Sequence, residues 1–200
     1  MIRFFVVEDH ALTNLGIREL LTAQGNFECS GYAVNSAEAL KKLEGGSLPD
    51  ILLLDLFLGE DSGIELLREI NKRFPTIKVL VYSMFEKPGI VSLALENGAK
   101  GFVSKSASEE ELLTAIKNIA SGEGYVQQNL VPQLITYHSM LDCLTKQEQR
   151  IFKSLLERKQ KAQIAKELNL ALRSIDNYLS RIYSKTGCAD HEDLLRRFGE

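Results

Sequence analysis

The chain reads Ile51-Leu52-Leu53-Leu54-Asp55 in the middle of its first half, and this stretch decides the fold. An apolar run without alternation is typical of a strand that is buried on both faces of a parallel sheet. Similar runs, most of them rich in Val, Ile and Phe, lie at 2–7, 27–34, 77–82 and 101–103, and stretches of helical period follow them. Strand and helix alternate five times. This pattern predicts a doubly wound α/β domain with a parallel sheet over residues 1–122.

Composition limits the alternatives. The chain has 200 residues, 44% hydrophobic and 26% charged, which suits one large or two small globular domains. Cys29, Cys143 and Cys188 lie far apart without a CxxC pair, so a disulfide framework or a cysteine zinc site is not expected. The longest apolar runs have four or five residues, whereas a membrane span needs about 20. We therefore expect a cytoplasmic protein without a signal peptide or a membrane partner.

The net charge of −3 hides an asymmetry between the two halves of the chain. Acidic residues exceed basic ones in residues 1–122, whereas Lys and Arg exceed Asp and Glu in residues 142–200. This distribution indicates two domains with different partners, the second of which can be a polyanion. A charge excess of this size also fits an ordinary solvated surface.

Polar residues follow the predicted strands where each one ends. Glu8 and Asp9 come after the first run, Asp55 after the third, Ser83 after the fourth, and Lys105 two residues after the fifth. The carboxyl ends of parallel strands share one edge of the sheet, so these side chains should meet in one crevice. Close carboxylates repel by roughly 4 kcal/mol per pair near a protein surface, and a divalent cation removes that cost. Mg²⁺ is the natural candidate, and Asp55 could then attack a phosphorus atom while Lys105 neutralises the transferring group.

Four segments of this half resemble the landmarks of a response-regulator receiver domain, a five-stranded, flavodoxin-like fold. They are Phe4-Phe5-Val6-Val7-Glu8-Asp9-His10, Leu52-Leu53-Leu54-Asp55-Leu56, Val81-Tyr82-Ser83 and Gly101-Phe102-Val103-Ser104-Lys105. The resemblance covers essentially all of residues 1–122 and implies that Asp55 is the phosphoacceptor. It also implies the Mg²⁺ ligands and the residues that respond to phosphate. The ligands are Glu8, Asp9, Asp55 and the backbone carbonyl of Phe57; the responding residues are Lys105 and Ser83, which contact the phosphoryl group, and Phe102, the aromatic switch.

Two positions near Asp55 qualify this interpretation. An aspartyl-phosphate phosphatase of the haloacid-dehalogenase type needs a second Asp two residues after its nucleophile, and Phe57 stands there. That class also needs a cap domain, for which 122 residues leave little room, so we do not expect an enzyme. Gly59 stands where the receiver family usually has proline, which loosens the loop beside the acceptor.

Residues 123–141 read as a linker with one short helix around residues 131–140. Thr145 and Glu148 then have the spacing of a capping box at the start of an amphipathic helix. Three further short helical patterns follow within residues 157–200, with a tight turn between the second and third helices of the set. Four short helices over residues 142–200 predict a helix-turn-helix domain. A small helical bundle that binds protein, or that only dimerises, remains the other interpretation of this pattern.

Several segments of this region resemble the LuxR-type DNA-binding module, among them Gln163-Ile164-Ala165-Lys166-Glu167-Leu168 and Arg173-Ser174-Ile175. Behind a receiver, such a module gives the NarL/FixJ-type architecture. The resemblance implies that the helix from about Arg173 to Lys185 lies in the major groove of double-stranded DNA. Its solvent face offers side chains for base edges, and other residues are placed for phosphates. The base-edge candidates are Asp176, Asn177, Ser180 and Arg181, and the phosphate candidates are Lys159, Lys161, Arg173, Ser174 and Lys185.

This module departs from its family in the recognition helix. Asp176 stands where the family commonly has lysine, and Tyr178 where it has histidine. A carboxylate is repelled by phosphates but can accept a hydrogen bond from a cytosine amine, so we expect altered or weaker DNA binding.

The sequence thus predicts a transcription regulator controlled by phosphorylation of Asp55, with a sensor histidine kinase or a small phosphodonor as the source of phosphate. The active form is expected to be a homodimer. The alternatives are a receiver whose tail recruits protein, and a DNA-binding regulator that acts without phosphate.

Overall fold

The computed structural model describes residues 1–59 and 61–199. Within that part of the chain, two compact units are found. The first comprises Met1–Met84 and Ala94–Gln127, and the second comprises Phe85–Leu93 and the residues from Gln128 onward. No helix in either unit, among the residues described, combines the length and apolarity that a membrane span requires.

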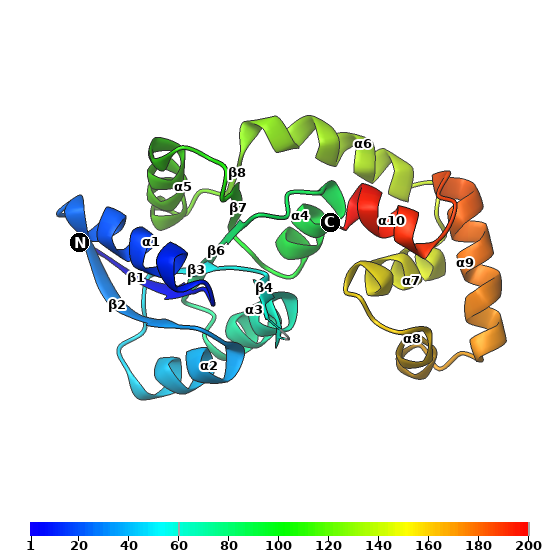
Figure 1. Cartoon of the computed structure of the whole chain (residues 1–200), viewed down its shortest axis with the longest axis horizontal. Helices are drawn as coiled ribbons and strands as arrows, with labels where there is room; N and C mark the ends of the chain where they lie inside the picture. The colour runs from blue at the N-terminus through cyan, green and yellow to red at the C-terminus, as the bar shows by residue number, and fades with distance from the viewer. Residues whose placement is uncertain (60, 200) are drawn as a thin grey trace. The chain divides into compact units, whose positions relative to one another are not determined.

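The first unit is built on a parallel sheet (Figure 1), which in the described residues has six strands in the order β2-β1-β3-β6-β7-β8. The strands are β1 (Ile2–Val7), β2 (Phe27–Ala33), β3 (Ile51–Leu54), β6 (Lys78–Ser83), β7 (Gly101–Ser104) and β8 (Tyr125–Val126). The five predicted strands are all present. β8 is an addition, because the segment that contains it was expected to be part of a linker. Tyr and Val favour strands, and these two residues pair with Gly101 and Phe102 along the edge that β7 leaves open.

Helices follow the strands as the sequence pattern predicts. They are α1 (Ala11–Ala23), α2 (Ser36–Gly45), α3 (Gly63–Arg73), α4 (Pro88–Glu96) and α5 (Glu109–Ser121). Asn35, Ser62 and Ser108 cap α2, α3 and α5, each accepting a hydrogen bond from a backbone N–H of the first turn. These caps fix where the loops leave the carboxyl edge of the sheet.

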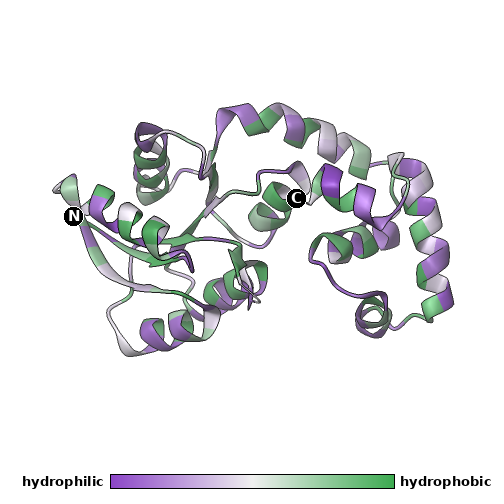
Figure 2. Cartoon of the chain, in the orientation of Figure 1, coloured by the Kyte–Doolittle hydropathy of each residue, from purple (hydrophilic) through white to green (hydrophobic). Residues whose placement is uncertain are grey.

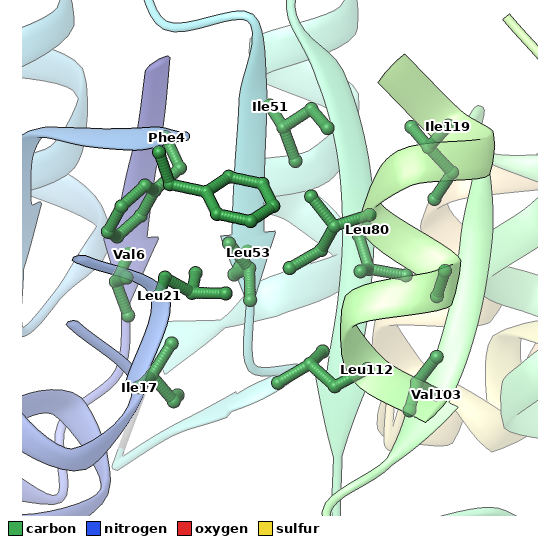
Figure 3. Close-up of a cluster of buried hydrophobic side chains, with 13 residues drawn as sticks. Phe4, Val6, Ile17, Leu21, Ile51, Leu53, Leu80, Val103, Leu112 and Ile119 are labelled. Atoms are coloured by element: carbon green, nitrogen blue, oxygen red, sulfur yellow. The ribbon is translucent and has the colours of Figure 1, made fainter. Parts of the chain in front are cut away.

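A cluster of apolar side chains fills the space between the sheet and helices α1 and α5 (Figure 3). Phe4 and Val6 of β1, Leu53 of β3 and Leu80 of β6 lie in one cluster with residues of both helices. These are Ile17 and Leu21 of α1 and Leu112 and Ile119 of α5. The alternate residues of the same strands point to the opposite face of the sheet, and they are also buried. Burial on both faces explains why the strands read as unbroken apolar runs.

The loop after β3 forms a small antiparallel ladder of β4 (Phe57–Leu58) and β5 (Asp61–Ser62). Gly59 lies in this loop with φ +65°, in the left-handed region. Proline, whose φ is fixed near −65°, cannot adopt this conformation. The loop beside Asp55 therefore follows a backbone path that a proline at position 59 would not allow.

The second unit consists mainly of helices. After the 3₁₀ turn η1 (Gln128–Leu130) come α6 (Val131–Leu141), α7 (Lys146–Leu156), α8 (Lys161–Glu167), α9 (Leu172–Thr186) and α10 (His191–Phe198). α6 is the short helix expected around residues 131–140, and α7 to α10 match the four predicted helices. The capping box of Thr145 and Glu148 is present at the start of α7. Asn169, with φ +53°, turns the chain between α8 and α9, and Gly187 ends α9 in the left-handed conformation.

One face of each long helix of this unit is buried. In Figure 2 helix α9 shows alternating hydrophilic and hydrophobic turns, and its buried residues are Ile175, Leu179 and Ile182. The rings of Phe152, Tyr137 and Phe198 from α7, α6 and α10 pack together, with centroids 5.6 to 6.1 Å apart. Such aromatic pairs contribute about 0.5–1.5 kcal/mol each beyond their area burial. They hold together helices α6, α7 and α10, which support α8 and α9.

Candidate functional site

The predicted charged residues of the first unit meet at the carboxyl edge of the sheet. Asp55 follows β3, and its backbone N–H donates to Val7 of β1, which fixes its place beside Glu8. Lys105, just after β7, places its Nζ 2.6 Å from Asp55 Oδ2 and 2.5 Å from Glu8 Oε2. Residues separated by up to 97 positions in the sequence are thus joined through one ammonium group.

Asp55 is held on both carboxylate oxygens. Ser83, at the end of β6, donates its hydroxyl to Asp55 Oδ1 at 2.8 Å, and the backbone N–H of Phe57 donates to the same atom at 3.3 Å. Lys105 donates to Oδ2. The residue is only 5% exposed, so its orientation is set by these donors.

Glu8 and Asp9 form a second group with a residue that the sequence analysis did not single out. One ligand atom each of Glu8, Asp9 and His10 lie within 4.8 Å of one another. His10 Nδ1 is 3.2 Å from Glu8 Oε1 and 2.8 Å from Asp9 Oδ1. Asn14 is also new: it is buried and donates its amide to the backbone carbonyl of Glu8. Asn14 lies one turn into the helix that follows Glu8 and Asp9, and this position is the sequence feature that could have identified it.

The electrostatics of the edge are dominated by Lys105. Burial acts to lower the pKa of this ammonium, but its hydrogen bonds to Asp55 and Glu8 act in the opposite direction and the net effect is a raised pKa. Burial also raises the pKa of the Tyr82 hydroxyl on the neighbouring strand. Lys105 therefore stays charged at neutral pH and offsets the repulsion of two buried carboxylates.

The donor set of this edge fits a hard divalent cation. Carboxylate oxygens are the ligands that Mg²⁺ prefers. Asp9 Oδ1 is buried and has no hydrogen-bond partner in the described part of the chain, since His10 Nδ1 lies close to it but outside hydrogen-bond geometry. A buried carboxylate oxygen without a hydrogen bond is costly, and a cation would satisfy it. Phe57, two residues after Asp55, is at the beginning of β4.

Phe102 has a different environment from the charged group. Its side chain is fully buried, and its strand β7 pairs with Val81 on one side and Val126 on the other. The next residue but one, Ser104, donates its backbone N–H to the side chain of Gln127, which follows β8. This hydrogen bond connects β7, which carries Phe102 and leads to Lys105, to Gln127, where the first unit ends.

The predicted nucleic-acid residues divide into two groups in the second unit. Those on α9 occupy its exposed side, opposite the buried stripe; they are Arg173, Asp176, Asn177, Ser180 and Arg181, with Ser174 half-buried. The three predicted lysines all form ion pairs. Lys159 pairs with Glu157 and Glu167, Lys161 with Asp176, and Lys185 with Glu148.

Comparison with known proteins agrees with this arrangement. Residues 4–117 match the response regulator receiver domain, and residues 142–198 match the bacterial regulatory proteins of the luxR family. The transcriptional activator protein ExaE of Pseudomonas putida is 30% identical over 95% of this chain and 92% of its own length. The transcriptional regulatory protein UhpA of Escherichia coli is 28% identical over 98% and 97%.

A solved structure shows the same fold. RcsB of Salmonella enterica serovar Typhimurium, bound to a promoter in the presence of the phosphomimetic BeF3⁻, aligns over 98% of this chain and 97% of that chain, with a TM-score of 0.73 and 23% identity. A receiver with a helix-turn-helix domain behind it is the architecture of a two-component response regulator. The chain belongs to this family, in its NarL/FixJ-type branch with a LuxR-type output domain. The family regulates transcription and is not enzymatic.

Proposed function

We propose that Asp55 is the phosphoacceptor of this regulator and that its phosphorylation controls DNA binding by the second unit. The observation that carries the proposal is the position of the Asp55 carboxylate, 2.6 Å from Lys105 Nζ and 2.8 Å from Ser83 Oγ. A buried carboxylate held between an ammonium and a hydroxyl has partners for the oxygens of an incoming phosphoryl group. A sensor histidine kinase or a small phosphodonor supplies that group.

The chain's own residues have separate roles in this transfer. An oxygen of Asp55 forms a bond to phosphorus while the bond from phosphorus to the donor breaks, and the leaving group departs with the electron pair. Lys105 offsets the charge on the phosphoryl oxygens, and Ser83 turns its hydroxyl from the carboxylate to one of them. Glu8, Asp9, Asp55 and the Phe57 carbonyl would hold Mg²⁺, which supplies further charge neutralisation at the transferring group.

The output follows from the elements next to this site. A hydroxyl that leaves Asp55 changes the end of β6, and Phe102 on β7 repacks in response. To move such a two-state element from 1:99 to 99:1 takes about 5.5 kcal/mol, and a few charge-assisted hydrogen bonds at about 1.5–3 kcal/mol each can supply it.

The phosphorylated form is proposed to be a homodimer whose two α9 helices read a two-fold site in double-stranded DNA. We propose a receiver over residues 1–122, to which β8 of the following segment adds an edge strand, and a DNA-binding domain over residues 142–200. Residues 123–141 connect the two domains. A regulator that binds DNA acts in the cytoplasm.

The phosphoacceptor is tested by labelling with acetyl phosphate, followed on gels that retard phosphoproteins. The full chain should be labelled when Mg²⁺ is present, and Asp55→Asn should abolish the shifted band. Asp142→Asn, which changes an exposed residue at the end of α6, should be labelled like the unaltered chain. Labelling that persists in Asp55→Asn would show that another residue accepts the phosphoryl group.

A further inference from the structure

The three predicted DNA-contacting lysines differ in what holds them. Lys159 is 15% exposed and lies between Glu157 and Glu167 at 3.1 and 2.7 Å. Lys185 donates to Glu148 at 2.7 Å, and the Glu148 side chain is only 3% exposed. Lys159 is enclosed by two carboxylates, and Lys185 binds a carboxylate that is buried in the fold of the unit. Both sets of ion pairs therefore stabilise the packing of the helices.

The pair of Lys161 and Asp176 is different because both of its members face solvent. Lys161 is the first residue of α8, and Asp176 lies in the second turn of α9, on the exposed side that also carries Arg173 and Asn177. Their charged atoms are 2.7 Å apart, and the two side chains are 55% and 59% exposed. An ion pair in this setting is worth about 0–1 kcal/mol. The pair therefore adds little to the stability of the unit, and it differs in this from the pairs of Lys159 and Lys185.

We propose that Asp176 acts as an internal substitute for a DNA phosphate and withholds Lys161 from non-specific DNA. The inference rests on the proposed DNA binding of this unit and assigns to Asp176 a specificity role in it. Affinity for DNA of random sequence comes almost entirely from lysine and arginine side chains that neutralise phosphates and release counterions. A lysine that is already neutralised by a neighbouring carboxylate adds little to this release. The pair thus lowers the affinity for random DNA without removing a cation from the sequence.

A simpler explanation makes a different prediction. If Asp176 only repels phosphates, Lys161 contacts DNA whether or not Asp176 is present, and the two charges act independently. If Asp176 withholds Lys161, the lysine contributes only after the carboxylate is removed. The dependence of binding on salt separates the two cases, because each neutralised phosphate adds about 0.9 to the slope of log K against log[salt].

The experiment measures binding of the full chain to a labelled random-sequence duplex by fluorescence anisotropy over a salt series. The variants are Lys161→Gln, Asp176→Asn and the double variant, each checked for folding by circular dichroism. Glu192→Gln, which removes a negative charge from an exposed position on α10, is the matched control for net charge.

Asp176→Asn should steepen the slope by about 0.9, which at 0.1 M salt corresponds to about eightfold tighter binding. Lys161→Gln should leave the slope unchanged in the unaltered chain and lower it by about 0.9 in the Asp176→Asn background. Glu192→Gln should keep the original slope.

Two results would overturn the proposal in distinguishable ways. An equal loss of slope on Lys161→Gln in both backgrounds, or no change of slope on Asp176→Asn, would show that Asp176 does not withhold Lys161, while DNA binding itself stands. Absence of binding by every variant at the lowest salt would instead refute DNA binding by this unit, and the inference with it.

Discussion

Lys105 neutralises two carboxylates that are almost completely buried, and its removal should destabilise the first unit strongly. Its Nζ lies 2.6 Å from Asp55 and 2.5 Å from Glu8, whose side chains are 6% and 2% exposed. Lys105→Met keeps an unbranched side chain, one atom shorter than lysine, and leaves two uncompensated anions. Breaking a buried ion pair in this way costs about 3–5 kcal/mol. At 1.36 kcal/mol per factor of ten, a loss of about 3 kcal/mol raises the population of the open state of the first unit about 10²-fold.

Hydrogen exchange of β3 measures this loss within the first unit alone. All four β3 residues are buried at the centre of the sheet, so their amides exchange through global opening of the unit. The exchange rate of the β3 peptide in Lys105→Met should rise about 10²-fold in chelator, and adding Mg²⁺ should reverse most of the rise. The double variant Lys105→Met/Asp55→Asn should recover at least half of the lost free energy.

Lys42→Met is the matched control for this experiment. Lys42 is 42% exposed and pairs with Glu38 on the surface of α2, so its loss should cost about 1 kcal/mol or less. A Lys105→Met protein whose β3 exchange stays within about twofold of the unaltered chain would refute the argument that Glu8 and Asp55 depend on this ammonium.

Three further changes test other parts of the structure. Hydrogen bonds from Lys185 and Thr145 lower the pKa of Glu148 in spite of its burial; the stabilisation is present above the ordinary glutamate pKa and is lost as pH falls through the lowered value. Exchange of α7 should therefore show a difference between Glu148→Gln and the unaltered chain that is constant at neutral pH and shrinks below about pH 4.5; a difference that grows in acid would contradict this. Phe102→Ala empties a fully buried site and should cost about 3–5 kcal/mol, read from exchange of β7; a cost under about 1 kcal/mol would mean that the ring is not packed there. A Cβ on Gly63 would lie 2.4 Å from Leu56 Cα, so Gly63→Ala should displace the loop after Asp55 and slow acetyl-phosphate labelling by about 10²-fold; unchanged labelling would show that this loop does not position the acceptor.

Much of the first unit was predictable because its strands are buried on both faces. That burial requires unbroken apolar runs, and the topology of a parallel sheet then brings their carboxyl ends together. Glu8, Asp55 and Lys105 could therefore be placed in one site without knowing any distance. β8 could not be found in this way, because two residues carry no period and their pairing depends on the free edge of β7.

The second unit shows where sequence reasoning stops. The capping box of Thr145 and the apolar stripe of α9 are local patterns, and both are present as predicted. The ion pairs of the lysines are not local: Lys185 and Glu148 are 37 positions apart, and Lys161 and Asp176 are 15 apart. The resemblance assigned Lys159, Lys161 and Lys185 to DNA phosphates, whereas tertiary packing decides which carboxylate each one meets.

The most direct test of the account is to locate the phosphoryl group on the chain. After reaction with acetyl phosphate and Mg²⁺, borohydride reduction converts an aspartyl phosphate to homoserine, which peptide mass spectrometry can place. The account predicts homoserine at position 55 and at no other aspartate, with the yield falling sharply in Lys105→Met. Homoserine at Asp9 or at another carboxylate, or none at position 55 in a labelled protein, would contradict it.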